Sequence, residues 1–237
     1  DLAIVDIMMP GIDGFELCVR MRQMRDIPVI FLSAKDEEAD QVVGFTLGAE
    51  GKPTLSYFFH GCPPGTKRIS YAASFGAESV CEEYAEYVKP ELAQFSAISV
   101  RERSGREIVR SLGMDAQIVC DPTLLLTKED YQALAGEVPV AAPRVFAYIL
   151  HGHREAAEVA SYVKRQLRDD SRAPDVCGLH EWLSCIRYSE VVVTNSFHCV
   201  MLSMILNRPF IAVLIKGSGM NDRIRTVLSD AGLADRA

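Results

Sequence analysis

Small polar residues and a histidine follow an apolar run near the end of the chain. In EVVVTNSFHCVML, residues 190–194 form the apolar run, and Asn195, Ser196 and His198 stand directly before residues with helical spacing. Asn and Ser are favoured helix N-caps because their side chains accept hydrogen bonds from free backbone N–H groups. Such a helix start binds anions, and an imidazole beside it exchanges protons near neutral pH. We therefore expect an anion-binding corner here, with Asn195 or Ser196 as the N-cap.

Cationic side chains follow two other apolar runs in the same way. They are Arg101 and Arg103 after residues 97–100, and Lys216 and Arg223 after residues 209–215. Taken singly, each of these cationic residues is better explained as a solvated surface residue than as a ligand of an anion. His198 taken singly is better explained as a structural histidine than as a catalyst. Their common position at the ends of apolar runs is what favours a site for a phosphate or a multiply anionic small molecule.

Other reactive side chains give weaker signals. Cys199 adjoins His198, but neighbours on a helix point in different directions, so the two do not form a nucleophile–base pair. His151 and His153 have no third ligand nearby and fall short of a zinc pattern. No metal site and no cofactor are therefore expected from these residues.

The elements that would position the cationic groups alternate along the chain. Strands are predicted over 68–73, 97–100, 117–120, 144–150, 190–194 and 209–215. Helices are predicted over 79–95, 105–112, 128–135, 154–168, 179–188, 197–206 and 221–231. Ser104 and Glu107 have capping-box spacing, which places one helix start at Ser104. This alternation predicts an α/β fold with mostly parallel sheets, whose carboxyl-terminal edges gather binding residues.

The first fifty residues contain a separate β-α-β pattern. Apolar runs at 2–5 and 27–32 flank an amphipathic stretch at 14–25. Asp6 ends the first run, where its carboxylate could bind a metal, act as a nucleophile or simply begin a loop.

The motifs around Asp6 resemble the receiver domain of two-component response regulators. They are D-x-M-M-P-G-x-D-G, P-V-I-x-L-S-A and L-G-A, within residues 1–50. The resemblance implies that Asp6 is the phospho-acceptor of a phosphorelay and that Ser33 senses the phosphoryl group. A receiver also needs Mg²⁺, held partly by an acidic pair on an earlier strand, and a lysine after a fifth strand. Lys52 has no such strand before it and the acidic pair is missing, so we expect an incompetent remnant, with Mg²⁺ required only by a complete receiver.

The remainder of the chain resembles the polysaccharide pyruvyl transferase family. The blocks that carry the resemblance are KRISYAASFG (67–76), FSAISVRERSGREIVRSLG (95–113), VCDPTLLLTKEDY (119–131), EWLSCIRYSEVVVTNSFHCVMLSMILNRPF (181–210) and KGSGMNDRIRTVLSDAGLADR (216–236). The likeness covers about residues 54–237. It implies a glycosyltransferase-B-like fold of two Rossmann-like domains, at 51–140 and 141–237. The first domain is incomplete, because the receiver-like segment at 1–50 stands in place of its opening strands, and residues 169–178 are short for the connection expected there.

The family resemblance also implies a reaction. The pyruvyl group of phosphoenolpyruvate is transferred to two sugar hydroxyls as a ketal, in the biosynthesis of a cell-surface exopolysaccharide. The expected partners are phosphoenolpyruvate and a glycan or lipid-linked acceptor, with the protein peripheral at the inner membrane. His198 is assigned the proton transfers. The substrate-binding residues would be Arg101, Arg103, Lys216 and Arg223 as anion ligands, with Asn195 and Ser196 as polar contacts.

Composition and charge argue against some other classes of protein. The net charge of −7 argues against a general nucleic-acid binder. No apolar stretch is long enough to span a bilayer. Seven cysteines without a C-x-x-C pair suit a reducing cytoplasm. Two other functions stay open: a signalling module phosphorylated on Asp6, and a nucleotide-sugar glycosyltransferase of similar architecture.

Overall fold

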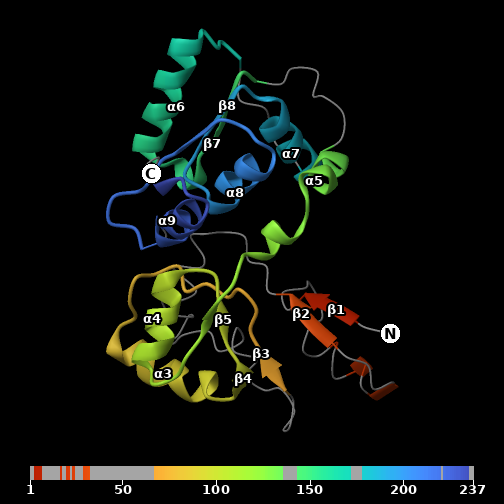
Figure 1. Ribbon diagram of the computed structural model, residues 1–237, viewed down its shortest axis with the longest axis vertical. Helices are drawn as coiled ribbons and strands as arrows, with labels where there is room; N and C mark the ends of the chain where they lie inside the picture. Colours follow the sequence, from red (N-terminus) through yellow and green to blue (C-terminus); the bar gives the residue numbers. More distant parts are fainter. Residues whose placement is uncertain are drawn as a thin grey trace. The chain divides into compact units, whose positions relative to one another are not determined.

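Strands and helices alternate along the chain, as the α/β prediction requires. The computed structural model describes residues 67–135, 143–171, 178–219 and 221–234, with parts of the first 32 residues (3–6, 17, 20, 21, 23, 24 and 29–32). The chain forms two compact units, one of residues 1–69 and 81–96 and one of residues 70–80 and 97–237 (Figure 1). Of the sequence-derived predictions, Ser33, the irregular stretch 51–66 and the spacer 136–142 lie outside the described residues.

The first unit contains the amino-terminal strand pair. Strand β1 (Ala3–Asp6) runs parallel to β2 (Val29–Leu32), and helical residues lie between them in sequence. This confirms the predicted β-α-β unit. Farther along, β3 (Arg68–Ile69) adjoins β4 (Phe95–Ala97), and α3 (Glu82–Leu92) connects them. Helix α3 buries one side through apolar residues four apart, at Tyr84, Val88 and Leu92.

The second unit holds a small sheet around β5 (Ser99–Val100). Strand β6 (Gln117–Ile118) pairs with it in parallel, and the Val119 N–H continues the pairing to the Val100 carbonyl at 2.9 Å. On the other side of β5, Ala73 forms a parallel bridge with Val100. Helix α4 (Arg103–Ser111) follows β5 and packs on this sheet. The predicted strands 68–73 and 117–120 are longer than the regular ladders β3 and β6, and in the first of them the chain bends at Tyr71 and Ala72.

A three-stranded parallel sheet lies at the centre of the same unit. Its order is β7 (Val145–Tyr148), β8 (Val191–Thr194) and β9 (Phe210–Ala212). Tyr148 is opposite Thr194, and Thr194 is opposite Ala212, so the carboxyl-terminal ends of the strands are level. Strand β8 is the middle strand, and a continuous valine run suits it because both of its faces are covered.

Helices cover both faces of this sheet (Figure 1). On one face, α6 (Arg154–Leu167) packs Ala160 against Val145 and Val193. On the other, α7 (Leu179–Tyr188) and α8 (Phe197–Ile205) pack against the alternate residues Phe146 and Val192. This alternation of faces is the period of a β-strand, and it yields a three-layer core.

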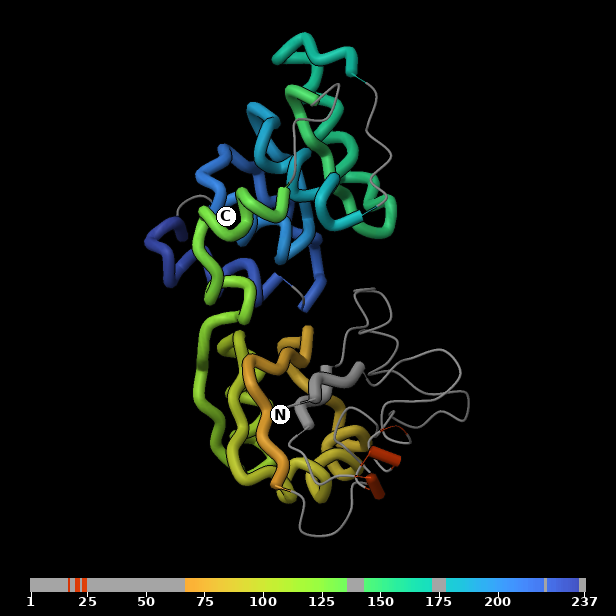
Figure 2. Tube along the Cα trace, turned by 90° about the vertical axis from the view of Figure 1, so that its right-hand side faces the viewer, coloured from red at the N-terminus to blue at the C-terminus, as the bar shows by residue number. Residues whose placement is uncertain are grey.

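The remaining described elements are two 3₁₀ turns and the helices α5 and α9. The chain passes from β6 through the short 3₁₀ helix η2 (Pro122–Leu125) into α5 (Lys128–Leu134), which Figure 2 follows as one continuous green segment. A second 3₁₀ turn, η3 (Leu150–Gly152), follows β7. Helix α9 (Asn221–Asp230) packs on α8. Among the described helices, none is long and apolar enough to cross a membrane.

Candidate functional site

A buried ion pair stands where β5 and β6 end. Arg101 follows β5 and Asp121 follows β6, and because these strands are parallel neighbours both side chains leave the same edge. Arg101 Nη1 lies 2.5 Å from Asp121 Oδ2. The other carboxylate oxygen, Oδ1, accepts the Thr123 N–H at 2.9 Å and caps η2. One oxygen of Asp121 therefore anchors the backbone, and the other faces the predicted site.

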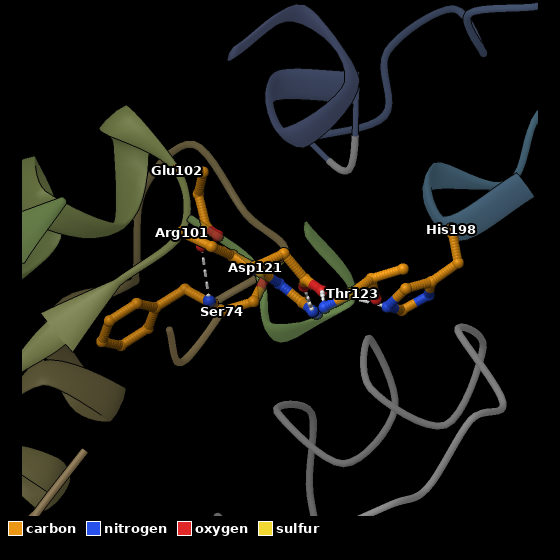
Figure 3. A network of polar contacts seen from close by, with 8 residues as sticks. Ser74, Arg101, Glu102, Asp121, Thr123 and His198 are labelled. Atoms are coloured by element: carbon orange, nitrogen blue, oxygen red, sulfur yellow. Dashed lines mark hydrogen bonds and ion pairs between the residues drawn. The ribbon is translucent and has the colours of Figure 1, made fainter. Parts of the chain in front are cut away.

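His198 lies beside that second oxygen. Its Nε2 is 3.9 Å from Asp121 Oδ2, and its side chain is 32% exposed (Figure 3). Ser196 is the N-cap of α8 and accepts the Cys199 N–H at 3.4 Å, so the second of the two predicted N-caps is the one observed. The imidazole is thus held in the first turn of α8, next to a carboxylate and in contact with solvent.

A second arginine joins this group through an aromatic ring. The guanidinium carbons of Arg101 and Arg223 lie 5.2 and 5.5 Å from the centre of the Phe197 ring. Both distances are in the range of cation–π attraction. Arg223, in the first turn of α9 as predicted, is only 2% exposed. Arg101, Asp121, Phe197, His198 and Arg223, together with Glu102, are called the arginine–histidine cluster below.

Glu102 supplies a second, fully buried carboxylate to the cluster. It follows Arg101, is 0% exposed, and accepts the Phe75 N–H at 2.7 Å through Oε1 (Figure 3). Gly105, one turn along α4, makes room for it: a Cβ there would lie 2.9 Å from the same oxygen. Burial raises the pKa of Glu102, although the Phe75 N–H and the charges of Arg101 and Arg223 oppose the rise.

The pKa of Asp121 moves in the opposite direction. Burial alone would raise it, but hydrogen bonds from Thr123 and the Arg101 guanidinium outweigh burial and hold the pKa below its ordinary value. Carboxylates with divergent pKa values in one site are typical of functional centres. Asp121 is the carboxylate that stays ionised and balances Arg101.

The raised pKa of Glu102 predicts a pH-dependent stability. Above the ordinary value of 4.5 the unfolded side chain loses its proton while the buried one keeps it, so rising pH destabilises the fold. Urea unfolding from about pH 4 to about pH 8 should show wild type losing stability relative to Glu102→Gln as pH rises. Glu107→Gln, an exposed change on the same helix, should show no such trend. A difference between wild type and Glu102→Gln that does not vary with pH would contradict the assignment.

Asn195 and Thr194 tie the strand ends together. Asn195 Oδ1 accepts the Leu150 N–H at 2.8 Å, and its Nδ2 donates to the Leu150 carbonyl at 3.3 Å. Thr194 Oγ1 donates to the Tyr148 carbonyl and accepts the Ser196 N–H. The three small polar residues Thr194, Asn195 and Ser196 at the end of β8 therefore fix the start of α8 relative to β7, and with it the place of His198.

Arg103 lies apart from the cluster. Its guanidinium pairs with Asp230 at 2.6 Å, and both side chains are more than half exposed. The predicted capping box at Ser104 and Glu107 is wrong, because α4 begins earlier, with Glu102 at the N-cap position. The Ser104 N–H is bonded instead by the Asp222 carboxylate of α9 at 3.0 Å. This end of α4 therefore already carries a negative partner.

Lys216 stands on the turn between β9 and α9. Asn221 shapes that turn by accepting the Ile215 N–H at 3.0 Å and donating to the Ile215 carbonyl at 2.6 Å. Lys216 is exposed, and among the described residues no hydrogen bond or ion pair joins it to the cluster. Gly219 of the same turn packs closely on the backbone of Ala77 and Glu78, where a Cβ would lie 3.0 Å or less from them.

Asp121, Glu102 and Phe197 were not singled out from the sequence. Asp121 follows an apolar pair in VCDPT, so the strand-end rule that selected Arg101 also applies to it. Glu102 and Phe197 carry no such signal, since only the packing shows that one is a buried acid and the other a platform for arginines. In the amino-terminal unit, Asp6 is the last residue of β1, as predicted, opposite Leu32 of β2.

Comparisons with known proteins find the same two families that the motifs indicated. A family model described as response regulator receiver domain matches residues 1–52. Over 57 residues the chain is 50% identical to the uncharacterized transcriptional regulatory protein YclJ of Bacillus subtilis. Over 50 residues it is 48% identical to the transcriptional regulatory protein AfsQ1 of Streptomyces coelicolor. The aligned residues are 24% and 21% of this chain and 25% and 22% of those relatives, and they cover the receiver region alone.

The larger part of the chain matches a transferase family. The family model described as polysaccharide pyruvyl transferase matches residues 42–216, which include Arg101, Asp121 and His198. No solved structure matches the chain. The chain belongs to the polysaccharide pyruvyl transferase family and carries a response regulator receiver domain at its amino terminus.

Proposed function

We propose that this chain transfers the pyruvyl group of phosphoenolpyruvate to two hydroxyls of a sugar, forming a ketal on a cell-surface polysaccharide or its lipid-linked precursor. The observation that carries the proposal is the convergence of Arg101, Arg223 and His198 on Asp121 and Phe197. Phosphoenolpyruvate has a carboxylate and a phosphate, and guanidinium groups suit both anions because they offer paired N–H donors. Lys216 would add a further cation from the turn before α9, and Arg103 is left outside the proposed site.

The proposed fold is glycosyltransferase-B-like, with Rossmann-like parts at 51–140 and 141–237. Two features support it: parallel strands in both small sheets, and candidate residues that follow the carboxyl-terminal ends of β5, β6 and β8. We place the reaction in the cytoplasm, with the protein peripheral at the inner membrane, where lipid-linked sugars are presented.

The reaction needs a group that both gives and takes protons. The methylene carbon of phosphoenolpyruvate gains a proton and becomes a methyl group. One sugar oxygen bonds to the adjacent carbon, the bond from that carbon to the phosphate oxygen breaks, and a second sugar oxygen completes the ketal. Of the two hydroxyl protons lost, one balances the methyl group and the other leaves with phosphate. His198 is partly exposed and next to an ionised carboxylate, which suits an imidazole for these transfers.

The test is release of phosphate from phosphoenolpyruvate by the purified chain, with and without a pool of bacterial glycan acceptors. Release that requires both the chain and an acceptor, with a ketal in the product, would support the proposal. Tight binding of uridine diphosphate with no affinity for phosphoenolpyruvate would contradict it, and would favour a nucleotide-sugar glycosyltransferase.

Phosphoryl acceptance by Asp6 is a second candidate function for the amino-terminal unit. It is favoured by the receiver match over residues 1–52 and by the position of Asp6 at the end of β1. If Asp6 accepts a phosphoryl group in spite of the missing acidic pair, incubation with a small phosphodonor and Mg²⁺ labels the wild-type chain and leaves Asp6→Asn unlabelled. Label that persists in Asp6→Asn, or no label on wild type, would contradict this function.

A further inference from the structure

We infer that Asp121 is a positioning residue that changes partner when the site is filled: it pairs with Arg101 in the free chain, and with His198 once a donor anion occupies Arg101. The identity of the donor rests on the proposed function. The exchange itself requires only that an anion bind Arg101.

The geometry places one oxygen between two partners. Asp121 Oδ2 is 2.5 Å from Arg101 Nη1 and 3.9 Å from His198 Nε2. The oxygen is therefore in a strong charge-assisted contact with Arg101, whereas its distance to His198 is too long for a hydrogen bond. Oδ1 stays on the Thr123 N–H at 2.9 Å, so a small rotation about that anchor brings Oδ2 to the imidazole. A shift of roughly 1 Å closes the gap.

The charges of the cluster make the exchange favourable. Asp121 balances Arg101, so the free site already holds a counter-charge beside that guanidinium. A phosphate or carboxylate recognises the guanidinium face that Asp121 now occupies, and it must compete with that carboxylate. Once Asp121 is displaced from Arg101, its Oδ2 has the His198 Nε2, now 3.9 Å away, as a potential partner within the cluster.

The consequence is a proton donor that forms only in the loaded site. A carboxylate at hydrogen-bond distance stabilises imidazolium, which raises the pKa of a histidine. Donor binding would thus charge His198 at the moment when a proton is needed at the methylene carbon. In the chain without a bound anion, Asp121 pairs with Arg101, and His198 would be less strongly paired with Asp121.

Asp121→Asn tests the exchange because its side-chain oxygen can keep the Thr123 contact while the charge is lost. Inorganic phosphate is the probe, titrated into the full chain while the His198 ring signals are followed by NMR. The variant should bind phosphate about tenfold more tightly, since its competitor for Arg101 is gone. In wild type, phosphate saturation should raise the pKa of His198 by about one unit more than in the variant.

Glu107→Gln is the matched control. It removes one carboxylate from an exposed position of α4, where Glu107 pairs with Arg110, and it should leave phosphate affinity unchanged. A folded Asp121→Asn chain that binds phosphate equally or less tightly overturns the inference. The inference is also overturned if phosphate raises the pKa of His198 by the same amount in Asp121→Asn and in wild type. If Asp121→Asn does not fold, the wild-type chain alone still tests the inference, because a His198 pKa that does not change on phosphate saturation overturns it.

Turnover separates this inference from the proposed function. With phosphoenolpyruvate and an acceptor, Asp121→Asn should lower both KM and kcat, whereas a merely structural role would raise KM or unfold the chain. A wild-type chain that shows the exchange with phosphate but never releases phosphate from phosphoenolpyruvate contradicts the proposed function alone. A chain that turns over without the exchange contradicts this inference alone.

Discussion

Replacing His198 by Gln is expected to slow acceptor-dependent phosphate release from phosphoenolpyruvate by roughly 10²–10⁴-fold. Gln retains a polar side chain of similar reach, but it cannot give and take protons near neutral pH. The loss should fall on kcat, because the proposed donor contacts come from Arg101 and Arg223, which pack on Phe197 and are left in place by the change. Steady-state phosphate release at several pH values measures it.

The control for His198→Gln is His151→Gln. His151 is exposed in η3 and has no contact with the cluster among the described residues, so this change should leave kcat within about twofold. A rate for His198→Gln equal to that of wild type would remove His198 from the mechanism. A fall confined to KM would reassign it to donor binding.

Replacing Arg101 by Lys should reduce kcat/KM for phosphoenolpyruvate by roughly tenfold to a hundredfold. Lysine keeps the positive charge but loses the paired N–H donors and the planar contact with the Phe197 ring. The buried carboxylate of Asp121 also loses the 2.5 Å contact, so a small fall in stability should accompany the kinetic defect.

Arg103→Lys is an unusually close control for Arg101→Lys. The two arginines flank Glu102 in the sequence, but Arg103 pairs with Asp230 on the surface. Exposed pairs contribute little, so Arg103→Lys should keep kcat/KM within about twofold. Equal losses of kcat/KM in the two variants would contradict the assignment of Arg101, and not Arg103, to the donor site.

The strand-end rule explains how much of the site could be predicted from sequence. Asn195, Ser196 and His198 follow a valine run that β8 confirms as a buried central strand, and the helix after it begins where the capping residues indicated. Arg223 was found in the first turn of α9 for the same reason. Such predictions succeed because the carboxyl-terminal ends of parallel strands and the starts of helices leave distinct local patterns.

The rest of the site depends on which side chains meet across elements. Arg101 and Arg103 are equivalent in sequence, but Arg101 leaves the end of β5 and pairs with Asp121, whereas Arg103, the first residue of α4, pairs with Asp230. The capping box predicted from the spacing of Ser104 and Glu107 does not form. The Ser104 N–H is instead bonded by the Asp222 carboxylate of α9, 118 residues along the chain. Glu102 could not be recognised as a buried acid without the loop at Phe75 that covers it.

In the proposed function, Arg101, Arg223 and His198 form one binding site for phosphoenolpyruvate. Calorimetric titration of phosphoenolpyruvate into wild type, Arg101→Lys, Arg223→Lys and Arg103→Lys tests it most directly. We predict saturable binding at one site in wild type and Arg103→Lys, and binding weakened at least about tenfold in each of the other two variants. Undiminished binding in both Arg101→Lys and Arg223→Lys, or none in wild type, would contradict the claim.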